Sequence, residues 1–84
     1  MYQVRKRDSS LEEYDRNKII ASIMHAGGTR EEADKVASEI DTWLPNVSVN
    51  SVIDSADIRT KILGLLGIIN PVACNDYAGY VKQV

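Results

Sequence analysis

The dipeptide Gly27-Gly28 constrains the fold most, because it ends one helix directly before the start of another. Glycine adopts, without steric cost, the left-handed conformation that closes a helix C-terminus. Thr29 and Glu32 follow with the spacing of a capping box, in which the threonine caps the new helix and the glutamate reaches back to the cap. The residues on either side of this junction are therefore predicted to form two separate helices.

Apolar residues recur at helical spacing in four segments. Their expected buried faces are, in chain order, Ile19, Ile20, Ile23 and Met24; Ala33, Val36, Ala37, Ile40, Trp43 and Leu44; Ile58, Ile62, Leu65, Leu66 and Ile69; and Ala73, Tyr77, Tyr80, Val81 and Val84. Asp15 and Ser55 are expected to cap the first and third helices. Pro45 is expected to end the second helix. Asn70 and Pro71 are expected at the cap and first position of the fourth.

The N-terminal residues alternate in the manner of a strand, with Val4 and Lys6 on one face. Turn-forming residues stand at positions 8–10, a return strand is expected at 11–14, and a short strand is expected near 49–53. An isolated hairpin is marginal in water, so it must lie on the helices. We therefore predict one domain over residues 1–84 with an α+β fold, in which an N-terminal β-hairpin and a third short strand lie on a four-helix bundle.

Composition excludes several classes of function. No segment has the roughly 20 apolar residues that cross a bilayer, and the N-terminus lacks the apolar run of a secretory signal, so a cytoplasmic protein without a membrane partner is expected. Cys74 is the only cysteine and His25 the only histidine, which disfavours a metal site or a Cys–His catalytic pair. The segment 31–57 holds seven acids and only Lys35 as a base, which disfavours direct nucleic-acid binding.

Two charged residues of the hairpin fall in phase with apolar neighbours. Lys6 shares a face with Val4, and Glu12 shares a face with Tyr14, so both charges are expected to face the helices. An inward charge is costly unless it is paired. Lys6 and Glu12 either pair across the turn or meet a ligand that has an anionic end and a polar ring or sugar. Lys18 adds positive charge in the first turn of the first helix, where the backbone and the dipole favour an anion such as a triphosphate.

The opening segment resembles the ATP-cone domain, a small allosteric nucleotide-binding module of ribonucleotide reductases and of the bacterial repressor of their genes. The residues that carry the resemblance are Val4, Lys6, Arg7, Asp8, either Glu12 or Glu13, Asp15, Lys18 and Ile19, with later support from Ser55, Ala56, Asp57, Ile58, Ala73, Tyr77, Tyr80 and Lys82. Two positions depart from the family pattern. Ser9 replaces the usual turn glycine, and Arg59 stands where some members carry a histidine.

The resemblance implies a nucleotide held between the hairpin and the helices. The phosphates would be held by Lys6, Arg7 and Lys18, together with Arg59 and Lys82. Glu12 would bind a polar part of the nucleoside, and adenine would lie on Val4, Ile19 and Ile23. Asp15 and Ser55 complete the expected site. The implied ligand is ATP or dATP with Mg²⁺. The implied partner is a ribonucleotide reductase catalytic domain or further copies of the chain.

Two function hypotheses from different classes remain open at this point. The first is a non-catalytic regulatory module that binds ATP or dATP, within a ribonucleotide reductase or as a stand-alone sensor. The alternative is a small helical protein-interaction module whose hairpin charges simply pair and which binds no nucleotide. A helix-turn-helix DNA binder is disfavoured by the acidic segment, and an enzyme by the lack of a nucleophile with a base.

Overall fold

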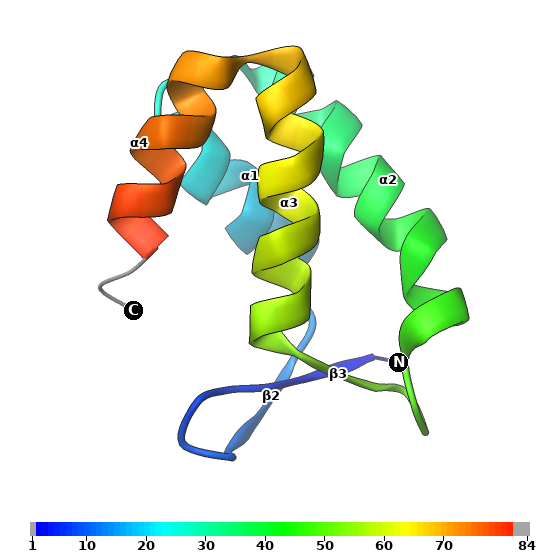
Figure 1. Ribbon diagram of the computed structural model, residues 1–84. Coiled ribbons are helices and arrows are strands. Elements are labelled where there is room, and N and C mark those ends of the chain that lie inside the picture. The colour runs from blue at the N-terminus through cyan, green and yellow to red at the C-terminus, as the bar shows by residue number, and fades with distance from the viewer. Residues whose placement is uncertain (1, 82–84) are drawn as a thin grey trace.

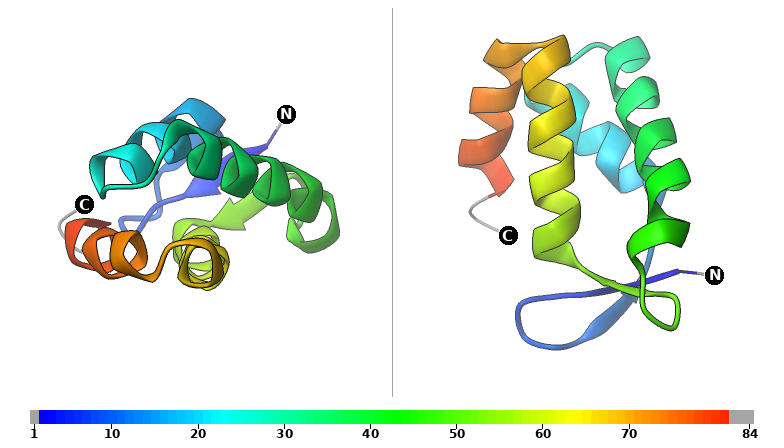
Figure 2. Two further views of the ribbon diagram at one scale, coloured as in Figure 1. Left: turned by 90° about the horizontal axis from the view of Figure 1, so that it is seen from above. Right: turned by 45° about the vertical axis from the view of Figure 1, so that its right-hand side comes forward.

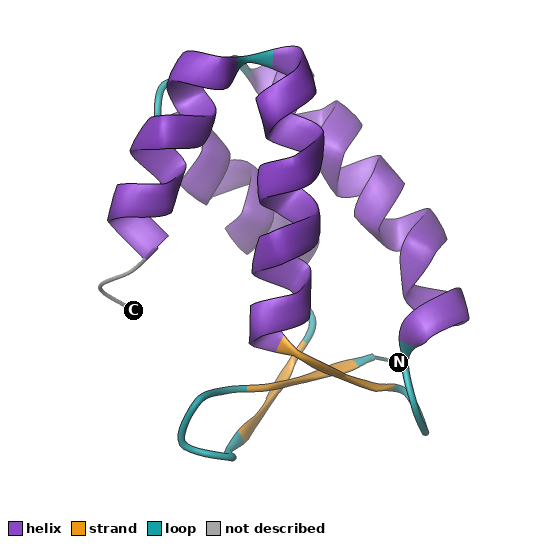
Figure 3. Cartoon of the chain, in the orientation of Figure 1, coloured by secondary structure: helices purple, strands orange, loops and turns teal. Residues whose placement is uncertain are grey.

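The computed structural model of the chain describes residues 2–81. Its elements, in chain order, are β1 (Gln3–Arg5), β2 (Leu11–Glu13), α1 (Arg16–His25), α2 (Arg30–Val47), β3 (Val52–Asp54), α3 (Ser55–Ile69) and α4 (Pro71–Val81) (Figure 1). Seen from above, α1 and α2 form one layer and α3 and α4 the other (Figure 2). The strands lie together at one end of the helices (Figure 3). The predicted α+β fold is confirmed.

The three strands form one sheet in the order β2-β1-β3. β1 pairs antiparallel with β2, which places Val4 opposite Glu12, and parallel with β3, which places Val4 opposite Ile53. The tight turn of the hairpin is held by Asp8, whose carboxylate accepts hydrogen bonds from the Ser10 amide at 3.0 Å and the Ser10 hydroxyl at 2.6 Å. Ser9 adopts φ 71° there, so it takes the left-handed conformation that glycine favours.

The helix boundaries follow the local signals in the sequence. Asp15 caps α1 by accepting from the Asn17 amide at 2.9 Å. The α1 C-terminus closes with Gly27 at φ 104°, and the Gly28 amide donates to the Ile23 carbonyl at 2.9 Å.

The starts of α2 and α4 are capped as predicted. The capping box of Thr29 and Glu32 is formed in both directions, at 3.1 Å and 2.9 Å. Asn70 caps α4 by accepting from the Ala73 amide at 3.1 Å, with Pro71 as the first helical residue. These four predicted signals are confirmed.

Three local predictions were wrong. Met24 is 43% exposed, whereas the buried residues of α1 are Ile19, Ile20 and Ile23, and the C-cap residue Ala26 is also buried. Pro45 does not end α2, which continues to Val47 although the proline nitrogen has no hydrogen to donate to the preceding turn. Ser55 is the first residue of α3 and not its cap, because β3 runs directly into the helix and places Asp54 at the cap position. The Asp54 carboxylate makes no cap bond and instead accepts from Arg5 at 3.1 Å.

The core lies between the two helical layers and under the sheet. Its buried residues are Ile19, Ile20, Ile23, Ala26, Ala33, Val36, Ala37, Ile40, Leu44, Ile53, Ile58, Ile62, Leu66, Ala73 and Tyr77. Leu65, Ile69 and Trp43 are partly buried against it, and the Lys61 ammonium lies 5.7 Å from the centroid of the Trp43 ring. The side chains of Tyr80, Val81 and Val84 lie outside the described part of the chain. Within residues 2–81, no helix is long and apolar enough to cross a bilayer.

Candidate functional site

A cavity of about 560 Å³ lies between the hairpin, α1, α3 and α4. Its volume falls within the range of small-molecule sites. It is lined by Val4, Lys6, Glu12, Glu13, Tyr14, Asp15, Lys18, Ile19, Ala21, Ser22, His25, Ser55, Ile58, Arg59, Ile62 and Tyr77. Most of the charged side chains come from the hairpin and the start of α1, whereas Ile58, Ile62 and Tyr77 belong to the buried core. The cavity therefore combines an apolar wall with a charged rim.

The structure brings most of the sequence-predicted site residues to this cavity. Those that line it are Val4, Lys6, Glu12, Asp15, Lys18, Ile19, Ser55 and Arg59. Ile23 does not, because it faces the core with 0% exposure. Arg7 lines an adjoining hollow. Lys82 lies outside the described residues.

The Glu12 carboxylate lies between two ammonium groups at the rim. Its Oε2 is 3.1 Å from Lys6 Nζ, and its Oε1 accepts from Lys18 Nζ. Of the two alternatives left open for these charges, the structure shows Lys6 paired with Glu12 across the turn. The sequence did not predict that Lys18 joins this pair. The side chains of Lys6 and Lys18 are 47% and 67% exposed. Lys6 and Lys18 are therefore two cations that share one carboxylate and that solvent and solutes can reach, although Glu13 and Asp15 also line the cavity.

Arg59 extends this positive charge away from the hairpin. Its Nη2 donates to the Ala78 carbonyl at 3.1 Å. Its Nε is buried without a hydrogen-bond partner among the described residues. A buried donor without a partner is costly, and an arginine in this state is rare in a folded protein.

The adjoining hollow, of about 440 Å³, is lined by Lys6, Arg7, Asp8, Ser55, Ala56, Arg59 and Thr60. It shares Lys6, Ser55 and Arg59 with the larger cavity, so the two spaces meet at these residues. The start of α3 also faces it, and the first amides of a helix have no partner within the helix. Hydrogen bonds from Ser10 lower the pKa of the Asp8 carboxyl, so Asp8 is charged and offsets one of the three cations. The hollow suits an anionic group that continues from the cavity.

Sequence reasoning missed half of the cavity wall. The missed residues are Glu13, Tyr14, Ala21, Ser22, His25, Ile58, Ile62 and Tyr77. Helical spacing could have found several of them, because Ser22 and His25 follow Lys18 on one face of α1, and Ile58 and Ile62 follow Ser55 on one face of α3. Ser22 donates to the Ile19 carbonyl at 2.9 Å, and its hydroxyl oxygen is 3.4 Å from the Tyr77 hydroxyl. These hydroxyls place polar atoms within the largely apolar wall.

The arrangement can bind a ligand that has a flat apolar part and a polyanionic part. Isoleucines and valine offer the apolar surface, and lysines and arginines from the hairpin, α1 and α3 can pair with the negative charges. Within residues 2–81, His, Cys, Asp and Glu side chains form no group of three or more suited to a metal ion.

Comparisons with known proteins point to one family. The family model described as the ATP cone domain matches residues 2–82. The chain is 33% identical over 82 residues to the transcriptional repressor NrdR of Fusobacterium nucleatum, covering 93% of this chain and 54% of the repressor. It thus spans about half of the repressor's length. It is also 48% identical over 40 residues to an uncharacterized protein of Archaeoglobus fulgidus, covering 48% of this chain and 85% of that protein.

Proposed function

Because the chain belongs to the ATP-cone domain family, we propose that it is a non-catalytic regulatory module that binds ATP or dATP beneath its hairpin. The observation that carries the proposal is the Glu12 carboxylate shared by Lys6 and Lys18 at the mouth of the cavity. Each of these ion pairs is partly exposed and contributes little to stability, so a ligand can replace them at small cost. A polyphosphate carries more negative charge than one carboxylate and competes well for both lysines.

The proposed pose divides the ligand between the two adjoining spaces. The nucleoside lies in the larger cavity, with its base against Val4 and Ile19. The triphosphate runs past Lys6 and Arg59, which border both spaces, toward Arg7. Mg²⁺ accompanies the phosphates and completes its coordination with water. Glu12, once released by the lysines, accepts hydrogen bonds from the ribose or the base.

The proposed role is to report the adenine nucleotide pool to a partner. ATP and dATP differ by one hydroxyl, and a site that hydrogen-bonds a hydroxyl discriminates well against a ligand that lacks it. Family membership and similarity to a transcriptional repressor support a partner in ribonucleotide reduction or its gene control. The partner is a ribonucleotide reductase catalytic domain, or further copies of the chain when it acts as a stand-alone sensor in the cytoplasm.

Calorimetric titration with ATP and with dATP, each with and without Mg²⁺, tests the proposal. We expect saturable binding, and a loss of about tenfold to a hundredfold in affinity for Lys6→Ala and for Lys18→Ala, because a hydrogen bond to a charged group contributes roughly 1.5–3 kcal/mol. Lys35→Ala is the matched control, since this exposed lysine lies on α2 and lines neither space. Circular dichroism of each variant checks that the fold is retained.

Absence of heat with both nucleotides would reject nucleotide binding. The hairpin charges would then serve only to hold the turn, and the chain would be a small interaction module. Equal losses for Lys35→Ala and Lys18→Ala would assign the effect to net charge instead of to the site.

A further inference from the structure

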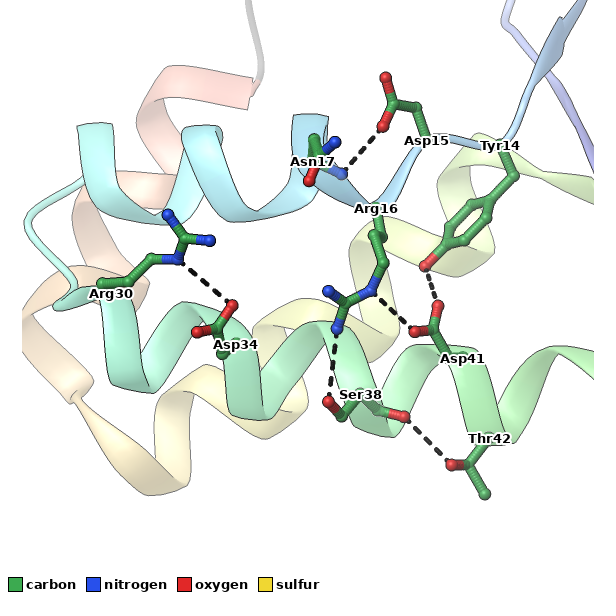
Figure 4. Close-up of polar contacts among 9 residues, drawn as sticks. All are labelled: Tyr14, Asp15, Arg16, Asn17, Arg30, Asp34, Ser38, Asp41 and Thr42. Atoms are coloured by element: carbon green, nitrogen blue, oxygen red, sulfur yellow. Dashed lines mark hydrogen bonds and ion pairs between the residues drawn. The ribbon is translucent and has the colours of Figure 1, made fainter.

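One carboxylate on α2 holds the connection between the hairpin and α1. Asp41 Oδ1 accepts a hydrogen bond from the Tyr14 hydroxyl at 2.8 Å, and Asp41 Oδ2 accepts from Arg16 Nε at 2.9 Å. Arg16 Nη2 also lies 3.4 Å from Ser38 Oγ, one turn earlier on α2. Figure 4 shows the Tyr14 and Arg16 side chains converging on Asp41 from either side of Asp15.

The connection that Asp41 holds is the one that sets the geometry of the pocket rim. Tyr14 and Asp15 join β2 to α1, which begins at Arg16, and the Asp15 side chain is used to cap the helix. Glu12 lies two residues before Tyr14, and Lys18 lies two residues after Arg16. Both of these side chains line the cavity and contact each other. The angle between β2 and α1 therefore decides how Lys18 and Glu12 meet.

The contacts are suited to fixing an angle more than to adding stability. The ion pair between Arg16 and Asp41 is 40% exposed on both sides, and such pairs contribute little. The Tyr14 hydroxyl is half-buried. Burial, followed by its hydrogen bond to Asp41, raises the pKa of Tyr14 above its ordinary value of 10, so the hydroxyl stays a donor at any physiological pH. Two directed bonds to one carboxylate hold the residues on either side of Asp15, where β2 is joined to α1.

We propose that Asp41 is a positioning residue for the nucleotide pocket, acting through Tyr14 and Arg16 on the Lys18–Glu12 contact. The inference rests on the proposed function, because it assigns Asp41 a part in nucleotide affinity although Asp41 does not line the cavity. Binding sites depend on supporting residues that hold the contacting groups in place, and loss of such support weakens binding without removing a contact.

The test compares ATP affinity across fully folded variants. Asp41→Ala and Asp41→Asn are expected to weaken ATP binding roughly tenfold, a usual effect for the loss of a supporting residue. Tyr14→Phe keeps the ring and removes only the donor, so it is expected to weaken ATP binding in the same direction and by less. Asp34→Ala is the matched control, because Asp34 lies two turns earlier on α2, pairs with Arg30 at 3.3 Å, and lines neither space.

A second readout needs no nucleotide. Amide hydrogen exchange at Asn17 and Lys18, whose amides bond to Asp15 at 2.9 Å and 3.1 Å, is expected to quicken in Asp41→Ala and not in Asp34→Ala. This measurement reports whether the start of α1 has loosened. A residue that only adds global stability would leave the ATP affinity of the folded protein unchanged.

The outcomes separate this inference from the proposed function. If the unmodified protein binds ATP and folded Asp41→Ala binds it equally well, the positioning role is overturned and nucleotide binding stands. If the unmodified protein binds no nucleotide, the proposed function fails and the role of Asp41 in affinity fails with it. Unchanged exchange at Asn17 and Lys18 in Asp41→Ala overturns the role whatever the affinities are.

Discussion

Glu32 and Asn70 join the starts of α2 and α4: the Asn70 side-chain amide donates to Glu32 Oε1 at 3.1 Å. The same oxygen accepts the Thr29 amide at 2.9 Å as part of the capping box. Asn70 in turn caps α4, because its side-chain oxygen Oδ1 accepts a hydrogen bond from the Ala73 amide. Two local capping motifs, far apart in the sequence, thereby become one contact between the two helical layers.

The capping contact predicts a dependence of stability on pH. Hydrogen bonds from the Thr29 backbone and then from Asn70 lower the pKa of Glu32 below its ordinary value of 4.5. A carboxyl whose pKa is lower in the folded state contributes stability that is present above the unfolded pKa and lost as pH falls through the folded pKa. Urea unfolding at about pH 6 and about pH 3 should therefore show a smaller acid loss for Glu32→Gln than for the unmodified protein.

Glu31→Gln is the control for removing one negative charge from the same turn of α2. Its side chain takes no part in the capping box or in the hydrogen bond between Asn70 and Glu32. An acid loss in Glu32→Gln as large as in the unmodified protein would contradict the assignment.

The hairpin turn predicts a stabilising substitution. Ser9 has φ 71°, a conformation that costs a residue with a side chain roughly 1 kcal/mol more than glycine. Ser9→Gly is therefore expected to raise the free energy of unfolding by about that amount, measured by urea unfolding. Ser10→Gly is the control: it removes a hydroxyl that donates to Asp8 at 2.6 Å, so it should not stabilise. Stabilisation by both changes would refute the conformational explanation.

Adjacent residues of α1 should differ sharply in their contribution to the core. Ile23 is 0% exposed and Met24 is 43% exposed. Ile23→Ala should lower the free energy of unfolding by about 3 kcal/mol, because it leaves a cavity among packed side chains. Met24→Ala should change it by less than about 0.5 kcal/mol. Denaturant unfolding measures both, and equal losses would mean that the inward face of α1 is assigned wrongly.

Substitution of two glycines by alanine is expected to change the stability of the protein in opposite directions. A Cβ at Gly64 meets nothing within 4 Å, so Gly64→Ala should stabilise α3 by about 1 kcal/mol. A Cβ at Gly28 would lie 2.7 Å from Ile23 Cγ2 and 3.1 Å from the Ile23 carbonyl oxygen. Gly28→Ala should therefore lower the thermal midpoint, whereas Gly64→Ala should raise it. A raised midpoint for Gly28→Ala would show that the α1–α2 junction is not closely packed.

About half of the residues that line the candidate site could be predicted from the sequence. Those residues follow patterns between near neighbours in the chain, whereas the others come together only through contacts between distant segments. Lys6, Glu12 and Lys18 were found because strand alternation and helix starts are local patterns. Tyr77 was assigned to the core, where it indeed lies, but nothing local indicated that it also lines the cavity. Ile23 was assigned to the ligand although its face of α1 turns fully inward.

The sequence alone determined where α1, α2 and α4 begin, because a cap such as Asp15, Thr29 or Asn70 acts on amides two or three residues away. It did not determine the end of α2 or the start of α3. Tertiary structure decided which segments meet. The parallel pairing of β1 with β3 joins residues about 49 positions apart, and it follows from packing both strands against the same helices. Packing likewise placed Lys6 and Lys18 on one carboxylate and brought Asp41 to the β2–α1 connection, because side chains distant in sequence become neighbours only when the apolar faces of the helices close on one another.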